Sequence, residues 1–164
     1  KLVITSGNIS APDLTIAAKT NFLHAVIPEV AIEIVGLRAP AYKLASERKT
    51  YWGQVAQLIA SAGDRKIMFL GDINYNPFLG ISASAPDIKF NLNSSFTIPN
   101  PEGEWSFISI DGKNKSRIDH VIVSDTLKVF NVKYMTTYDE IMLAGSKSDN
   151  AITDHAVLSL EVDT

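Results

Sequence analysis

A carboxylate and an amide stand directly after an apolar run in the segment "KIMFLGDINYNPF", residues 66–78. The run ends at Gly71, and Asp72 and Asn74 follow two residues apart, so an extended chain would project both side chains together. A carboxylate can accept a proton from water or bind a hard cation such as Mg²⁺, and an amide can orient that water. The same residue types also form turns, so a plain strand-to-turn junction is the alternative explanation.

A second polar pair stands before an apolar run near the end of the sequence. Asp154 and His155 come immediately before "AVLSLEV", residues 156–162, which has the composition of a strand. An imidazole there can donate a hydrogen bond, and as imidazolium it can stabilise developing negative charge. Ligand sites in layered α/β folds often lie at strand ends, so we expect both polar pairs to lie at such a site.

The composition excludes several kinds of site. The 164 residues include no cysteine, which rules out disulfides, thiolate nucleophiles and cysteine-bound zinc. A net charge of −3 argues against a protein that binds nucleic acid through overall positive charge. It does not exclude an enzyme whose positive charge is local or comes from a metal. The sequence shows no apolar run long enough to span a membrane and no signal peptide. The compartment stays open, with the cytoplasm favoured.

The first half of the chain predicts the elements that lead to Asp72. Two β-branched runs, residues 21–28 and 30–37, predict a hairpin that turns at "PEV". Apolar residues then recur at spacings of three and four, which predicts an amphipathic helix over residues 45–62. Residues 66–72 follow as a continuous apolar strand of the buried type.

The second half is predicted to consist of loops and strands. Residues 76–101, rich in Ser, Asn and Pro, predict a long loop on the active face, and residues 136–155 are expected to be mostly loop. Strands are predicted at residues 1–6, 104–111, 116–124, 127–135 and 156–162. One helix followed by many strands predicts an α/β fold of the α+β type, a sandwich with much antiparallel pairing, in a single domain over residues 1–164.

Three motifs together carry a family resemblance. They are "GDIN" (71–74), "RIDH" (117–120) and "TDH" (153–155), and each stands against a predicted strand. In this order and spacing they resemble the endonuclease/exonuclease/phosphatase superfamily, which includes deoxyribonucleases, abasic-site endonucleases, inositol-polyphosphate phosphatases and sphingomyelinases. The segment "EWSFIS" also resembles the Thr/Ser-Trp strand that precedes the second motif in the family. His120 stands where the family often has Tyr, and Thr153 stands where it has Ser.

The resemblance implies a four-layer, deoxyribonuclease-like fold, a two-sheet β-sandwich flanked by helices. It also implies a hydrolase of phosphodiester or phosphomonoester bonds, a nuclease or a phosphatase, that uses Mg²⁺ or Mn²⁺. Such hydrolysis needs a nucleophilic water, neutralised phosphoryl oxygens and help for the leaving group. The resemblance assigns the water and the phosphate to Asp72 and Asn74, and the metal to Asp154 with Asp72 near it. Arg38 stands where the family often has His or Tyr, and it either clamps a phosphate or is an ordinary surface residue.

The resemblance also pairs Asp119 with His155, whose imidazole would contact the phosphoryl group. A carboxylate that holds one imidazole nitrogen fixes the tautomer and favours the charged form. The alternative is a structural pair between Asp119 and Arg117, which would share one face of a continuous strand. His24 and His120 lie inside apolar runs, and we expect both to pack in the interior.

One feature departs from the family pattern. The family carries an Asn and a Glu on two early strands, and the Glu is a main metal ligand. The resemblance begins near Ile34, so both positions are expected upstream of Lys1. On this view the sequence is about the C-terminal two-thirds of such a domain, with an incomplete metal site and weak affinity for Mg²⁺. The alternative to an enzyme is a non-catalytic interaction module that keeps the phosphoesterase fold. The preferred phosphoester and the oligomeric state stay open.

Overall fold

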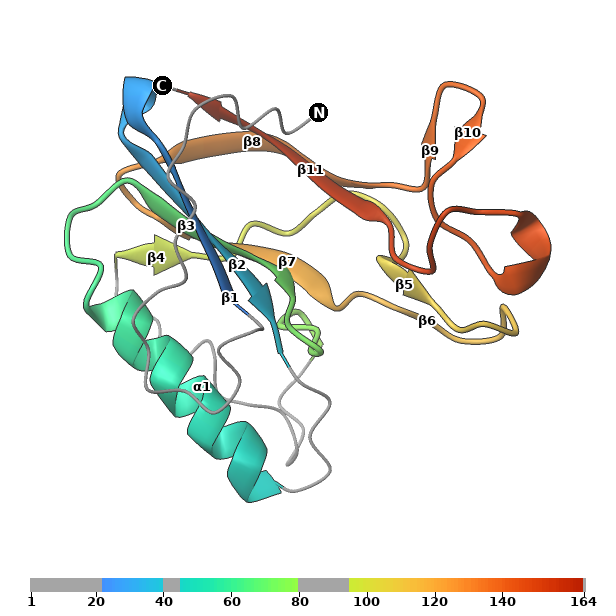
Figure 1. The fold of residues 1–164 in the computed structure, drawn as a ribbon, viewed down its shortest axis with the longest axis horizontal. Helices are drawn as coiled ribbons and strands as arrows, with labels where there is room; N and C mark the ends of the chain where they lie inside the picture. Colours follow the sequence, from blue (N-terminus) through green and yellow to red (C-terminus); the bar gives the residue numbers. More distant parts are fainter. Residues whose placement is uncertain (1–21, 40–44, 80–94, 164) are drawn as a thin grey trace.

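A computed structural model of the chain describes residues 22–39, 45–79 and 95–163 (Figure 1). The helix and strands of these ranges, in chain order, are β1 (Phe22–Ile27), β2 (Ile32–Arg38), α1 (Ala45–Ala60), β3 (Ile67–Asp72), β4 (Phe96–Thr97), β5 (Phe107–Ile108), β6 (Lys115–Ser116), β7 (Asp119–Ser124), β8 (Lys128–Met135), β9 (Thr137–Tyr138), β10 (Ile141–Met142) and β11 (Val157–Asp163). The strand predicted at residues 1–6 and most of the loop predicted at 76–101 lie outside the described residues.

The central layer is a five-stranded sheet in the order β1-β2-β3-β7-β4 (Figure 1). The predicted hairpin is confirmed, since β1 and β2 pair antiparallel around a short 3-10 turn, Pro28–Val30. β3 follows helix α1 and pairs with β2 in parallel, and β7 pairs antiparallel with the other edge of β3. β3 is therefore a central strand, which explains why its sequence is a continuous apolar run.

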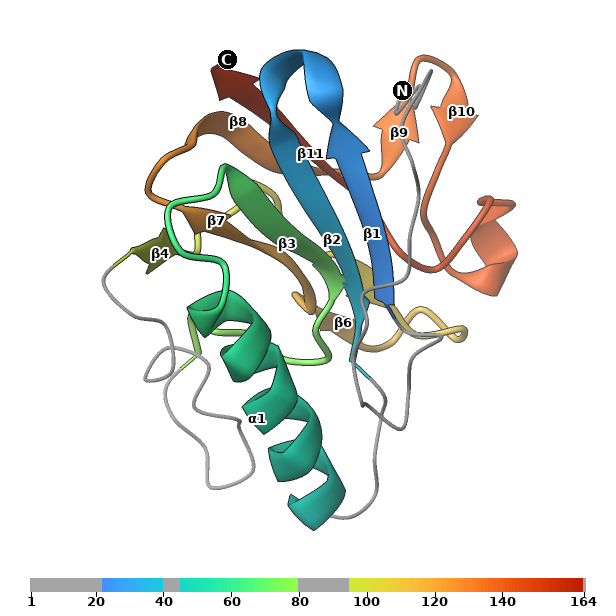
Figure 2. The same cartoon turned by 60° about the vertical axis from the view of Figure 1, so that its left-hand side comes forward.

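Helix α1 covers one face of this sheet (Figure 2). Its buried side chains recur every three or four residues along one side of the helix; they are Tyr51, Trp52, Val55 and Ile59. The predicted helix is confirmed, although it ends at Ala60 rather than at 62, because the chain turns there through Gly63 at φ +57°. No helix in the described part of the chain is long and apolar enough to cross a membrane.

Strands β8 and β11 form a second, antiparallel layer against the opposite face. Ile32, Met68 and Val121 reach into this interface from the central sheet. The second layer contributes Val129, Val132, Leu158, Leu160 and Val162. Apolar residues alternate with polar ones along β8 and β11 because one face of each strand meets water. The predicted α+β class and the two-sheet sandwich with a helical face are therefore confirmed.

Two predicted strands are shorter than expected. Residues 104–111 contribute only β5, and the strand predicted over 116–124 is split between β6 and β7. At the break, the backbone N–H groups of Ile118 and Asp119 donate to the side-chain oxygen of Ser106 instead of to a neighbouring strand. Sequence alternation cannot reveal such a break, because a distant side chain satisfies the backbone.

The segment between β8 and β11, predicted as mostly loop, contains two small elements. The hairpin β9–β10 projects from the sandwich (Figure 1), and a short 3-10 helix, Lys147–Asp149, follows it. Ser146 is the N-cap residue of this helix, and its backbone N–H donates to the Asp149 carboxylate at 2.7 Å. A bridge between Ala144 and Thr153 then returns the chain to the start of β11. The segment thus reaches Asp154 and His155 along a defined path.

Gly71 lets β3 deliver Asp72 to the end of the sheet. Its φ of +136° lies in a region that other residues rarely adopt, and an added Cβ would lie 2.1 Å from the carbonyl oxygen of Leu37. The backbones of β2 and β3 therefore approach each other too closely here for any residue but glycine. Backbone packing explains the first residue of the "GDIN" motif.

We expect Gly71→Ala to lower the free energy of unfolding by about 2–4 kcal/mol, because it adds a backbone clash to a strained φ. Gly53→Ala is the matched control, since Gly53 lies exposed in α1 with no atom within 4 Å of an added Cβ. Alanine should stabilise the helix there. Urea unfolding followed by circular dichroism measures both variants. Equal stability of Gly71→Ala and wild type would contradict the close approach of the two strands.

Candidate active site

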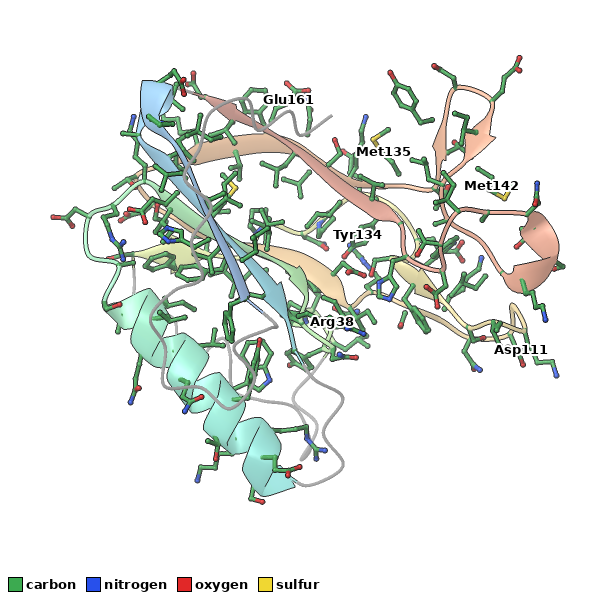
Figure 3. The ribbon with its side chains drawn as sticks, in the orientation of Figure 1. Arg38, Asp111, Tyr134, Met135, Met142 and Glu161 are labelled. Atoms are coloured by element: carbon green, nitrogen blue, oxygen red, sulfur yellow. The ribbon has the colours of Figure 1, made fainter. Side chains whose placement is uncertain are left out.

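One end of the central sheet brings three charged residues together. Arg38 ends β2, Asp72 ends β3 and Asp119 begins β7. Arg38 is the register partner of Asp72 in the parallel pair, and Asp72 is the register partner of Asp119 in the antiparallel pair. Residues opposite each other in neighbouring strands lie within side-chain reach, so these three side chains lie close together at one end of the sheet. Figure 3 shows Arg38 at this end of the sandwich.

Asp119 and His155 form a close pair at this end of the sheet. Nδ1 of His155 lies 3.0 Å from Oδ2 of Asp119 and 3.3 Å from its Oδ1. The carboxylate is nearly buried, whereas 32% of the imidazole surface is exposed, so a ligand can reach the ring. The imidazole also packs against Phe107, and the centres of the two rings lie 5.0 Å apart. Because Nδ1 faces the carboxylate, Nε2 is the ring nitrogen available to a ligand.

Arg117 binds elsewhere, so the alternative pairing of Asp119 with Arg117 is wrong. Nη2 of Arg117 donates to Oδ1 of Asn100 at 2.8 Å and to the carbonyl of Pro101. Its guanidinium lies 5.4 Å from the centre of the Tyr134 ring. Arg117 precedes the first residue of β7, so the alternation expected for a continuous strand does not extend to it.

Asp72 and Asn74 are joined by a turn. The sequence predicts an extended chain here, with a turn as the alternative. Asn74 has a φ of +52°, and its backbone N–H donates to Oδ1 of Asp72 at 2.9 Å. Its side-chain nitrogen donates to the carbonyl of Ala39 and lies 3.4 Å from Oδ2 of Asp72. The expectation of an extended segment is therefore wrong beyond Asp72, although the two side chains do meet. Since its amide nitrogen has protein acceptors, the amide oxygen of Asn74 is the atom that could accept from water or bind a cation.

The two strand-end carboxylates lie in a partly desolvated environment. Burial raises the pKa of Asp72, against the lowering effects of the Asn74 N–H and of the charge on His155. Burial also raises the pKa of Asp119, against its hydrogen bonds with Ser106 and His155, and the charge of Asp72 raises it further. His155 lowers the pKa of both carboxylates, and the charge of Asp72 raises that of Asp119, so the carboxylates and the imidazole lie in one electrostatic environment.

Asp154 adds an exposed carboxylate next to His155. Its backbone carbonyl accepts from the N–H of Ile108 at 3.0 Å, and its Oδ1 accepts from the Thr153 hydroxyl at 3.3 Å. Mg²⁺ prefers carboxylate and amide oxygens as ligands, and the side chains of Asp72, Asn74 and Asp154 carry oxygen atoms of these types. In the part of the chain that the structure describes, no three His, Asp or Glu side chains lie together as a metal site.

The two remaining histidines have different surroundings. His120 is fully buried, as predicted; its Nε2 donates to the carbonyl of Arg117 at 2.9 Å, and its Nδ1 lies 3.3 Å from the Tyr134 hydroxyl. Burial lowers the pKa of His120 to about 4, so the ring is neutral at pH 7. His24, by contrast, is partly exposed and lies 2.9 Å from Oε2 of Glu33, so the prediction that it packs in the interior is wrong.

Sequence reasoning missed two residues that contact Asp119. The Ser106 hydroxyl accepts its backbone N–H at 3.0 Å, and the Tyr134 hydroxyl donates to its backbone carbonyl at 2.8 Å. The one sequence signal for Ser106 was its position directly after Trp105 in "EWSFIS". Tyr134 gave none, because a tyrosine in an alternating strand is an ordinary interior residue.

Comparison with protein-family models matches residues 3–155 to the Endonuclease/Exonuclease/phosphatase family. The chain belongs to this family. The match includes all three motifs from which the resemblance was drawn, and it extends into the residues before β1. No curated protein sequence matches the chain.

Several solved structures share this fold at low sequence identity. An AP endonuclease from Archaeoglobus fulgidus has a TM-score of 0.73 and 14% identity, over 97% of this chain and 72% of that one. The 3′ phosphatase NExo from Neisseria, bound to a product DNA hairpin, has a TM-score of 0.72 and 15% identity, over 98% and 71% of the two chains. A humanized D. rerio TDP2 has a TM-score of 0.65 and 14% identity, over 97% and 66%. At these identities the likeness establishes the fold.

We expect protonation linked to His120 to lower the free energy of unfolding by about 3 kcal/mol between pH 6.5 and pH 4. The unfolded chain takes up a proton near the ordinary pKa of 6.5, whereas the folded ring has a pKa of about 4. This contribution to stability is therefore complete above pH 6.5 and is lost as the pH falls through that window. His120→Gln keeps a donor for the Arg117 carbonyl but does not titrate. Urea unfolding should show a flatter pH dependence for the variant, and equal slopes would contradict a neutral buried His120.

Proposed function

We propose that this family member is a metal-dependent phosphoesterase that hydrolyses a phosphodiester or phosphomonoester bond, as a nuclease or a phosphatase. The observation that carries the proposal is the Asp119–His155 pair, 3.0 Å apart, beside Asp72 at one end of the sheet. Members of the family are hydrolases that act on phosphoester bonds. The family match over residues 3–155 also supports a single domain over residues 1–164.

Asp72 is the proposed acceptor of a proton from the attacking water. Burial raises its pKa, and a carboxylate with a raised pKa is a stronger base once it is ionised. The backbone N–H of Asn74, which donates to Oδ1 of Asp72 at 2.9 Å, fixes the two residues against each other. The amide oxygen of Asn74 would accept from the same water and orient it toward phosphorus.

His155 is the proposed contact to the phosphoryl group, through Nε2. The carboxylate of Asp119 lies 3.0 Å from Nδ1, which orients the ring and leaves Nε2 to face a ligand. An imidazolium at this position would stabilise the charge that builds on the phosphoryl oxygens. Arg38 is the second proposed phosphate contact, because it is the register partner of Asp72 and its guanidinium can bind two oxygens at once.

Mg²⁺ or Mn²⁺ is the proposed cofactor, since the family generally depends on a divalent metal. When bound, such an ion lowers the pKa of a bound water and neutralises phosphoryl charge. Asp154 is the proposed ligand from this chain, with Asp72 near the ion. Both offer the carboxylate oxygens that these hard cations prefer, and the exposed side chain of Asp154 is accessible to an ion from solvent.

We expect His155→Ala to lower kcat at least about 100-fold without loss of helix and strand signal, because it removes the group that contacts the phosphoryl oxygens. His24→Ala is the matched control, because His24 also pairs with a carboxylate, that of Glu33. Glu33 lies opposite the first residue of β3, so this pair stands at the other end of the sheet from Asp72. The assay follows Mn²⁺-dependent hydrolysis of an activated phosphodiester and of an abasic-site DNA duplex, with the longest natural chain that contains this sequence.

The preferred substrate in that assay distinguishes a nuclease from a small-molecule phosphatase. Full activity of His155→Ala would contradict the proposed role of the imidazole. A wild-type protein that binds either probe but hydrolyses neither, over a range of Mn²⁺ concentrations, would favour the non-catalytic module.

Removal of the metal should abolish hydrolysis. We expect EDTA to reduce the rate to background and added Mg²⁺ or Mn²⁺ to restore it. Asp154→Asn should raise the metal concentration that gives half the maximal rate by about tenfold or more. The same variant should leave the unfolding midpoint in EDTA unchanged, because the carboxylate is exposed. Undiminished hydrolysis in the presence of the chelator would contradict metal dependence.

A further inference from the structure

Ser106 lies between the two chain segments that carry Asp119 and His155. Its side chain is fully buried. Its backbone carbonyl accepts from the N–H of Ala156 at 2.7 Å, directly after His155, and the neighbouring Phe107 forms a bridge with His155. Its hydroxyl oxygen, in turn, accepts the backbone N–H of Asp119. A single residue is therefore bonded to both sides of the Asp119–His155 pair.

The Ser106 hydroxyl takes the place of a strand at the edge of β7. Its oxygen accepts the N–H of Ile118 at 2.8 Å and that of Asp119 at 3.0 Å. Within the described residues, β4 pairs with β7 only at Val123 and Ser124, the other end of the strand. A buried N–H without an acceptor costs as much free energy as a lost hydrogen bond. The hydroxyl thus fixes the main chain of Asp119 where no strand can.

The same hydroxyl also acts on the Asp119 side chain. Burial raises the pKa of Asp119, and a hydrogen bond from Ser106 opposes that rise. Tyr134, labelled in Figure 3, completes the arrangement, because its hydroxyl donates to the Asp119 carbonyl at 2.8 Å. The main chain of Asp119 is therefore held at its N–H by Ser106 and at its carbonyl by Tyr134.

We propose that Ser106 is a positioning residue for phosphoester hydrolysis, which fixes Asp119 against His155 so that the imidazole presents Nε2 to the phosphoryl group. This inference rests on the proposed function of the site. Ser106 acts through Asp119 and through the main chain beside His155, not through the substrate. Misplacement of a reacting group by about 1 Å can cost about 100-fold in rate, so the loss should appear in kcat rather than in KM.

Ser124 provides a matched control at the opposite end of β7. It is also buried; its hydroxyl oxygen accepts the N–H of Ile67 at 3.2 Å and lies 2.8 Å from the Thr126 hydroxyl. Ser124→Ala therefore removes the same kind of hydrogen bond from the same strand, away from the pair. If Ser106 only stabilised the fold, Ser106→Ala and Ser124→Ala would behave alike.

The kinetic experiment compares Ser106→Ala, Ser106→Thr and Ser124→Ala in the full natural chain. We expect Ser106→Ala to lower kcat about 10- to 100-fold with KM changed less than about twofold. Ser106→Thr retains the hydroxyl and should recover most of the loss, and Ser124→Ala should keep kcat within about twofold of wild type. An unchanged kcat in Ser106→Ala, or an equal loss in Ser124→Ala, would overturn the proposal.

A second measurement needs no activity, so it separates this inference from the proposed function. The nitrogen-15 chemical shifts of the His155 ring, at one fixed pH, report whether Nδ1 still bonds to Asp119. We expect them to change in Ser106→Ala and to stay constant in Ser124→Ala. Unchanged shifts in Ser106→Ala would overturn the proposal even in an active enzyme. Changed shifts in a protein without hydrolytic activity would support the restraint on His155 and overturn the proposed function instead.

A variant of Tyr134 keeps the proposal testable should Ser106→Ala fail to fold. Tyr134→Phe keeps the ring in the interior but removes the hydrogen bond to the Asp119 carbonyl. It loosens the same restraint from the other side, so it should also lower kcat and change the His155 shifts. Wild-type values in both measurements would overturn the role of the restraint.

Discussion

The site depends on one pairing, the antiparallel register of β3 and β7 that sets Asp72 opposite Asp119. A slip of one residue would turn every side chain of β7 to the other face of the sheet. Burial prevents that slip, because Val121 and Val123 fill the interface with the second sheet while Ile122 fills the interface with α1. Apolar packing at the centre of the strands thus fixes where the carboxylates lie at their ends.

The same burial sets the electrostatics of the site. It raises the pKa of Asp72 and of Asp119, while His155 opposes the rise at both carboxylates. His120, the residue next to Asp119, has its pKa lowered to about 4 by burial and therefore adds no positive charge at pH 7. Two carboxylates with raised pKa values and a histidine with a lowered pKa, all at one end of a sheet, are typical of a functional site. Buried carboxylates are rarely favourable for stability alone.

Strand pairing does not extend over the whole site, and side chains replace it where it stops. The ladder between β3 and β7 reaches Asp119, but on the other edge the hydroxyls of Ser106 and Tyr134 bind its main chain. Side-chain donors and acceptors satisfy the backbone there without a neighbouring strand. The site combines strand pairing on one side of Asp119 with side-chain hydrogen bonds on the other, while 32% of the His155 side chain stays exposed.

Local sequence patterns were sufficient to predict the family, the residue types of the site and most of the elements. Periodicity predicts the first hairpin, α1 and β3, and motif order singles out Asp72, Asp119 and His155, because these signals are local. The three-dimensional fold was needed to show that Asp119 pairs with His155, 36 residues away, rather than with Arg117. His24 and His120 show why. Both lie in apolar runs, but among the described residues His24 stands on the outermost strand, β1, whereas His120 stands on β7, which lies between β3 and β4. Burial depends on which segments cover a strand, and those segments come from elsewhere in the chain.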